Sequence, residues 1–92
     1  MKYWRVEWHH DFRDEPVVIY NEIGEDGYEC RKVQKYRDGH LAWADEQYET
    51  DEIGLGEVPV GTLDEVNKQP EFSAVEITAD EFTKIWREAG GL

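Results

Sequence analysis

The fold is decided by the stretch YECRKVQKYRDGHLAWADEQY, residues 28–48, which carries the pattern of a long β-hairpin. At its centre, Asp38-Gly39 is a dipeptide that tolerates the positive φ angles of a two-residue type I′ turn, and apolar and aromatic residues follow on both sides. Such a turn fixes the register of the hairpin. In this register two of the opposed pairs carry unlike charges, which stabilise a sheet by roughly 0.2–1 kcal/mol each, and this agreement supports the register independently of the turn. The predicted pairs are Tyr36 with Leu41, Gln34 with Trp43, Lys32 with Asp45 and Arg31 with Glu46.

Side chains alternate along each strand, so this register divides the hairpin into two faces. The first face would carry Cys30, Gln34, Tyr36, Leu41 and Trp43, and the second Val33, Lys35, Ala42 and Ala44. We expect the first face to be the core side of the sheet, because it holds the larger aromatic and aliphatic side chains.

Two further strands are predicted before the hairpin. Residues 2–8 alternate strictly, with Trp4, Val6 and Trp8 on one side, as expected of a half-buried strand. Residues 16–23 contain a β-branched run that is too short for a helix. The turn dipeptide Asp26-Gly27 joins this run to the hairpin, and a three- or four-residue loop is an alternative to a two-residue one. The two-residue loop would oppose Glu22 to Arg31, Ile19 to Gln34 and Ile23 to Cys30.

Two helices are predicted from their start signals. The sequence from Thr62 to Glu65 is a capping box, so a short helix over 63–68 begins there and must end before Pro70. A second capping box runs from Thr78 to Glu81, and it opens a helix over 79–89. The apolar residues of that helix recur at helical spacing on one face only: Phe82, Ile85, Trp86 and Ala89.

These elements predict a single α+β domain over residues 1–92. We expect a four-stranded, mainly antiparallel sheet formed by residues 2–8, 16–23, 28–37 and 40–48. Because the C-terminal helix is apolar on one face, it should pack on one side of the sheet, against the face that carries Trp43.

The chain of 92 residues has a formal net charge of −12, and the charge is unevenly distributed. Residues 38–82 hold thirteen acidic side chains against the single cation Lys68. A negative field of this kind disfavours nucleic acid as a partner and favours either a basic protein partner or solubility alone. Neither a signal peptide nor an apolar span is apparent, and the one cysteine cannot form an intrachain disulfide, so we expect a cytoplasmic protein without membrane contact.

No residue pattern predicts catalysis, a cofactor or a metal. Adjacent His9 and His10 would point in opposite directions on an extended chain, and no second ligand pair accompanies them. His40 is expected to be solvated beside the turn, and Cys30 to behave as a small hydrophobic residue. The glycines at 54 and 56 do not complete a GxGxxG motif, because Pro59 occupies the third glycine position. An enzyme is therefore the least favoured of the functional classes.

The candidate binding surface lies where the last predicted strand runs into an acidic loop. Carboxylates around aromatic side chains suit a site for a basic protein, because charge accelerates encounter and aromatic rings hold the complex. The residues are Trp43, Asp45, Glu46, Tyr48, Glu49, Asp51 and Glu52. The alternative is a solvated strand edge whose charges prevent aggregation. The alternative function is a small-ligand-binding or house-keeping domain without catalysis.

Four segments resemble a family of small bacterial proteins described only as a domain of unknown function. They are residues 1–10 (MKYWRVEWHH), 27–33 (GYECRKV), 54–59 (GLGEVP) and 77–86, and the resemblance extends over nearly the whole chain. The family offers no catalytic residues that could be transferred to this sequence. In size and charge such small acidic domains are similar to immunity proteins of bacterial toxin systems, which implies an inhibitor of a basic toxin as one role.

Overall fold

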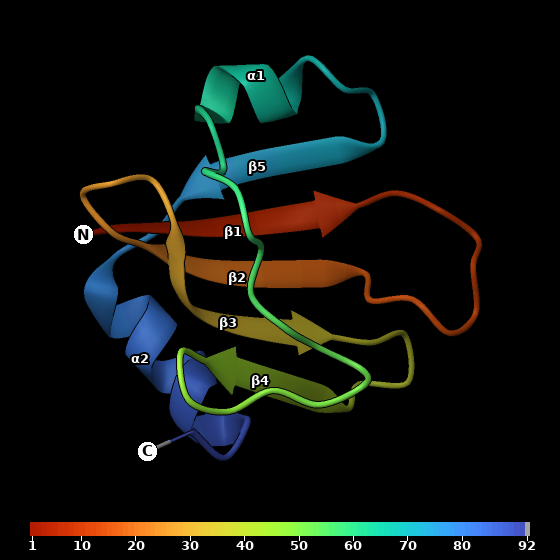
Figure 1. Ribbon diagram of the computed structural model, residues 1–92. Coiled ribbons are helices and arrows are strands. Elements are labelled where there is room, and N and C mark those ends of the chain that lie inside the picture. Colours follow the sequence, from red (N-terminus) through yellow and green to blue (C-terminus); the bar gives the residue numbers. More distant parts are fainter. Residues whose placement is uncertain (92) are drawn as a thin grey trace.

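The computed structural model describes residues 1–91, which form one five-stranded antiparallel sheet and two helices (Figure 1). The strand order is β4-β3-β2-β1-β5, so β4 and β5 are the edge strands. The α+β class and both helices were predicted, whereas the sheet has five strands in place of the expected four. The elements are β1 Lys2–Trp8, β2 Val18–Ile23, β3 Glu29–Lys35, β4 Leu41–Asp45, α1 Leu63–Asn67, β5 Phe72–Glu76 and α2 Ala79–Glu88.

Strand β5, which the sequence did not reveal, pairs antiparallel with β1 and sets Ala74 opposite Val6. Its outer edge is bonded by a side chain of α1. The Asn67 carboxamide donates from Nδ2 to the Ala74 carbonyl oxygen (2.9 Å) and accepts the Ala74 N–H at Oδ1 (2.7 Å). The short helix therefore serves to fix the edge of the sheet.

The β3–β4 hairpin forms as expected, but its predicted register is wrong by one residue. The observed pairs set Arg31 opposite Asp45 and Val33 opposite Trp43. A type I′ turn needs positive φ at two successive residues, and here only Gly39 (φ 94°) has one, because Asp38 keeps a negative φ and bonds the His40 N–H through its carboxylate. The turn is consequently longer by one residue. None of the four predicted pairs forms: Tyr36 with Leu41, Gln34 with Trp43, Lys32 with Asp45 and Arg31 with Glu46.

The β2–β3 register was predicted correctly over most of its length. Glu22 lies opposite Arg31 and Ile19 opposite Gln34, whereas a bulge after Glu22 sets Ile23 against Glu29 and not against Cys30. The turn that follows contains Gly27 in a left-handed conformation (φ 84°), and the Gly27 N–H donates to the Gly24 carbonyl. The predicted tight turn is therefore present in a longer form, which is the alternative left open above.

Both faces of the sheet are covered, which corrects the expectation of a single core face. Helix α2 packs Phe82 and Trp86 against Val33, Trp43 and the neighbouring tyrosines of β1 and β2. The segment between β4 and α1 crosses the sheet toward β5 (Figure 1), and its apolar residues pack on the opposite face. The predicted register placed Val33 and Trp43 on opposite faces of the sheet. The observed register, shifted by one residue, places both on the face that α2 covers. The residues buried on the second face include Trp4, Val6, Tyr36, Ala42, Ala44 and Ile53.

The two helices begin where their capping residues predict. Thr62 accepts the Glu65 N–H and Thr78 accepts the Glu81 N–H, and Glu81 in turn bonds the Thr78 N–H. Helix α2 ends at Glu88, and Gly90, which has a left-handed conformation (φ 98°), lies near the Nε1 edge of the Trp43 ring. The contact between Trp43 and α2 was predicted, and it places the β4 edge and the C-terminal end of α2 side by side.

Candidate functional site

The predicted binding residues follow the free edge of β4 and the loop after it. We refer to residues 45–52 as the acidic edge. Asp45 ends β4, and its backbone N–H donates to the carbonyl oxygen of Tyr48 (3.0 Å), so the chain reverses tightly over Glu46 and Gln47. The Asp45 carboxylate accepts the Gln47 N–H (2.9 Å), which holds this reversal. The first half of the acidic edge is thereby fixed against the sheet.

Two aromatic rings form the centre of this surface. Tyr48 stacks on Trp43 with ring centroids 4.2 Å apart, and Trp43 meets Trp86 of α2 edge to face at 5.1 Å. Trp43 is half-buried, whereas Tyr48 is 45% exposed. The exposed tyrosine ring therefore rests on a tryptophan that the core holds in place.

The carboxylates of the acidic edge do not act as one group. Glu46, Glu49 and Asp51 are exposed, and within residues 1–91 none of them forms an ion pair. Glu52 is different, because its Oε1 lies 2.8 Å from Nε2 of His40. The structure thus brings Trp43, Asp45, Glu46 and Tyr48 together at one end, and it turns Glu52 toward the β3–β4 turn at the other.

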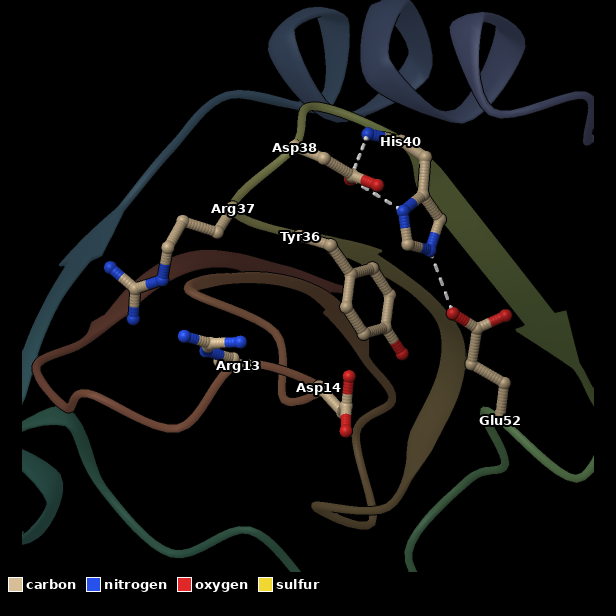
Figure 2. Close-up of a pocket in the computed structure, with 7 residues that line it drawn as sticks. All are labelled: Arg13, Asp14, Tyr36, Arg37, Asp38, His40 and Glu52. Atoms are coloured by element: carbon tan, nitrogen blue, oxygen red, sulfur yellow. Dashed lines mark hydrogen bonds and ion pairs between the residues drawn. The ribbon is translucent and has the colours of Figure 1, made fainter.

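His40 is held between two carboxylates, which the sequence did not predict. Its Nδ1 lies 2.6 Å from Asp38 Oδ1, and its ring stacks on Tyr36 with centroids 4.2 Å apart (Figure 2). The bond to Glu52, with that to Asp38, raises the pKa of His40 above its usual 6.5, and the bonds from His40 lower the pKa of Asp38. His40 remains exposed as expected, yet it clamps the end of the acidic edge to the turn.

The same residues line an open pocket of about 550 Å³. Figure 2 shows Tyr36 between His40 on one side and the guanidinium groups of Arg13 and Arg37 on the other. Burial, with the charge of Glu52, raises the pKa of Tyr36 to about 12, so this phenol stays protonated at neutral pH. The pocket mixes two arginines with three carboxylates and presents no activated nucleophile. Its lining therefore indicates a structural clamp.

The clamp gives a titration that can be tested. We expect His40 to have a pKa above 6.5, and Glu52→Gln to lower it, because the Glu52 bond is the main cause of the rise. A raised pKa means that the stabilisation is complete below pH 6.5 and is lost as the pH rises through the pKa of the folded state. NMR titration of the His40 ring protons measures it. Glu49→Gln, an exposed acid of the same loop, is the control, and an equal pKa in Glu52→Gln and wild type would contradict the clamp.

The remaining histidines and the cysteine have ordinary structural partners. His9 Nε2 lies 2.8 Å from the Ser73 hydroxyl, whereas His10 accepts the Phe12 N–H at Nδ1 and so donates from Nε2 to the Pro16 carbonyl (2.7 Å). No group of three or more metal-ligating side chains occurs in the part of the chain that the structure describes. Burial raises the pKa of the Cys30 thiol, which disfavours the reactive thiolate.

Comparison with known proteins identifies the family. Residues 2–91 match the model of a family described as Domain of unknown function (DUF6881). The chain belongs to the DUF6881 family. No curated protein and no solved structure matches the chain. Functional inference for this DUF6881 domain therefore depends on its own geometry.

A second polar arrangement in the DUF6881 domain was missed by sequence reasoning. Glu29, whose side chain is 5% exposed, lies 3.0 Å from the Lys32 ammonium group, accepts the Gly56 N–H (2.7 Å) and bonds the Asn21 carboxamide. Lys32 also donates to the Gly54 carbonyl (3.1 Å). The predicted β2–β3 register already opposes Asn21 to Lys32. The contacts of residues 54–56 with Glu29 and Lys32 join distant parts of the chain, and no local sequence pattern predicts them.

Among residues 1–91, no helix is long and apolar enough to cross a membrane.

Proposed function

We propose that this DUF6881 domain is a protein-binding module whose acidic edge occupies the cationic surface of a basic partner. An immunity-type inhibitor that neutralises a bacterial toxin is the role that fits such a surface most directly. The observation that carries the proposal is the Trp43–Tyr48 stack, because it presents an exposed aromatic ring in the same segment as Glu46, Glu49 and Asp51, which form no ion pair within residues 1–91.

The stack supports binding because it is already ordered. Tyrosine and tryptophan dominate the residues whose truncation weakens protein complexes most. Ordering a side chain on binding costs about 0.5–1.5 kcal/mol, and a ring that is fixed beforehand avoids most of that cost. Here Trp86 holds Trp43 from α2, and Trp43 holds Tyr48. Tyr48 is therefore the anchor that we expect to control dissociation.

The charges support a cationic partner. Glu46, Glu49 and Asp51 are exposed in the segment that contains Tyr48, and the protein as a whole carries a formal net charge of −12. Carboxylates form short, charge-assisted hydrogen bonds with Arg and Lys side chains. On a partner whose cationic surface normally holds phosphates, these carboxylates would take the phosphates' place, and inhibition would need no chemistry. Long-range attraction would also make association fast at low ionic strength.

A contact experiment tests which surface binds. Tyr48 is replaced by a photo-crosslinking phenylalanine analogue, and Val75, 45% exposed on the opposite edge strand, is replaced in the same way as the matched control. After irradiation in the native host, we expect Tyr48 alone to crosslink a basic protein, at a peptide rich in Arg or Lys. Equal products from both positions, or an acidic partner at Tyr48, would contradict the proposal.

A kinetic experiment then separates charge from anchor, with the crosslinked partner purified. Glu46→Gln, Glu49→Gln and Asp51→Asn together should slow association roughly tenfold at low salt and flatten its salt dependence, as loss of electrostatic steering does. The control removes equal charge from the far edge through Asp64→Asn, Glu71→Gln and Glu76→Gln. Tyr48→Ala should instead raise the dissociation rate roughly thirtyfold, the effect of about 2 kcal/mol at an interface anchor. Equal association rates for the two charge variants would remove the acidic edge from the mechanism.

A further inference from the structure

The face of the sheet opposite α2 contains an open cavity of about 310 Å³ that the proposed protein contact does not use. It lies over β1 and β2, between the segment that contains residues 56–60 and the α1–β5 pair. Its walls are mainly apolar, and they include Val6, Ile19, Val60, Val66 and Phe72. Apolar hollows of this size with a few convergent polar groups are the usual form of small-molecule sites.

Three polar side chains of the cavity gather at its β2–β3 end, whereas Gln69 lines the wall between α1 and β5. Asn21, Glu29 and Lys32 all line this end, and Asn21 is 6% exposed. Glu29 and Lys32 form an ion pair, so their charges cancel locally. The carboxylate can only accept hydrogen bonds, which means that Asn21 must present Nδ2 to Glu29 and leave its Oδ1 on the other side.

Two hydrogen-bonding positions then remain open. Within residues 1–91, no group donates a hydrogen bond to Asn21 Oδ1, so this acceptor is open to a molecule in the cavity. The Lys32 ammonium has three N–H donors, and two of them serve Glu29 and the Gly54 carbonyl. An unpaired acceptor and an unpaired donor therefore lie together at the end of an apolar cavity.

We propose that this cavity binds a neutral, mainly apolar small molecule whose one polar end is a hydroxyl or a primary amide. Such a group donates to Asn21 Oδ1 and accepts from Lys32 at the same time. A carboxylate has no proton for Asn21 and faces Glu29, whereas an ammonium group has no acceptor for Lys32 and faces its charge. The apolar body of the ligand would replace water against Val6, Ile19 and Phe72.

Four probes with one alkyl chain test the polar end: octanol, octanamide, octanoate and octylamine. Binding is followed by NMR through the side-chain amide signal of Asn21 and by the fluorescence of Trp4, which also lines the cavity. We expect saturable binding of octanol and octanamide, and roughly tenfold or more weaker binding of the two charged probes, since an unpaired buried polar group weakens a complex by that order. No saturable binding, or octanoate binding as tightly as octanol, would overturn the proposal.

A filling variant tests the location. Val66→Phe adds volume to the cavity wall from α1, and we expect it to reduce octanol binding at least tenfold with the fold intact by circular dichroism. The matched control is Val75→Phe, which makes the same change on β5 at an exposed position outside the lining. If Val66→Phe fails to fold, Val60→Phe fills the cavity from the opposite wall. Unchanged octanol affinity in a folded filling variant would place binding elsewhere. The three amide substitutions of the acidic edge should leave octanol binding unchanged, so the two proposals can fail separately.

Discussion

Replacing Trp86 by alanine is expected to lower the free energy of unfolding by about 3–5 kcal/mol, the usual cost of truncating a large buried aromatic residue. Trp86 is 2% exposed, and its ring contacts Trp43 edge to face and lies parallel to Phe82. Gly91 lies directly against the ring, in a space where a Cβ atom would clash. Because small domains are stable by only about 5–15 kcal/mol, we expect a large fraction of the variant to be unfolded.

Urea denaturation followed by circular dichroism measures this loss. The control is Tyr48→Ala, which removes an aromatic ring from the exposed side of the same stack and should cost far less. The control also shows whether the binding variant is folded. A loss below about 1 kcal/mol for Trp86→Ala would mean that α2 contributes little to the core, since buried aromatic truncations exceed that value.

Replacing Arg31 by methionine is expected to have an effect of similar size, about 3–5 kcal/mol, because it leaves a buried carboxylate without its cation. Glu22, whose side chain is 9% exposed, accepts two bonds from Arg31, at 2.8 Å from Nε and 2.5 Å from Nη2. The guanidinium group also lies over the rings of Phe82 and Trp86, at 5.0 and 4.9 Å from their centres. Arg31 therefore connects the sheet to α2 through both charge and stacking.

The pH dependence of stability separates these two roles. The bonds from Arg31 hold the pKa of Glu22 below its usual 4.5. The ion pair therefore stabilises the fold fully above pH 4.5, and this stabilisation is lost as the pH falls through the lower pKa of Glu22 in the folded state. Arg31→Met should abolish this part of the acid transition. The double variant with Glu22→Gln should recover part of the lost stability, since no buried charge then remains. A double variant less stable than Arg31→Met would contradict the account.

Local signals were sufficient for four strands and both helices, because turn dipeptides and capping boxes act over a few residues. Strand β5 lacked such a signal. Its inward residues are only Phe72 and Ala74, and it becomes a strand by pairing with the edge of β1 and with Asn67. The predicted register of the β3–β4 hairpin was wrong because of a side-chain contact. The Asp38 carboxylate accepts the His40 N–H, and this bond favours a longer turn than the two-residue turn that Asp-Gly suggests.

The candidate site likewise contains residues that the sequence predicts and contacts that it does not. The acidic edge is contiguous in the chain, so its residues could be found from composition, and the Trp43–Tyr48 stack follows from the reversal after Asp45. The bond between His40 and Glu52 joins residues on either side of a strand and leaves no pattern in the sequence. The open positions in the cavity depend on the orientation of one carboxamide, which only the pairing of Glu29 determines.

The carboxamide of Asn67 makes the two hydrogen bonds at Ala74 that a neighbouring sixth strand would otherwise make. Exposed strand edges are where sheets of different molecules join, and here the outward N–H of Ala74 already has an acceptor and its outward C=O already has a donor. An added peptide would have to displace Asn67 there, and so would gain no net hydrogen bond at that residue. Copies of this domain fused in tandem, or held at high local concentration, thus meet an obstacle to joining their sheets at β5, and contacts through side chains become the easier way for them to associate.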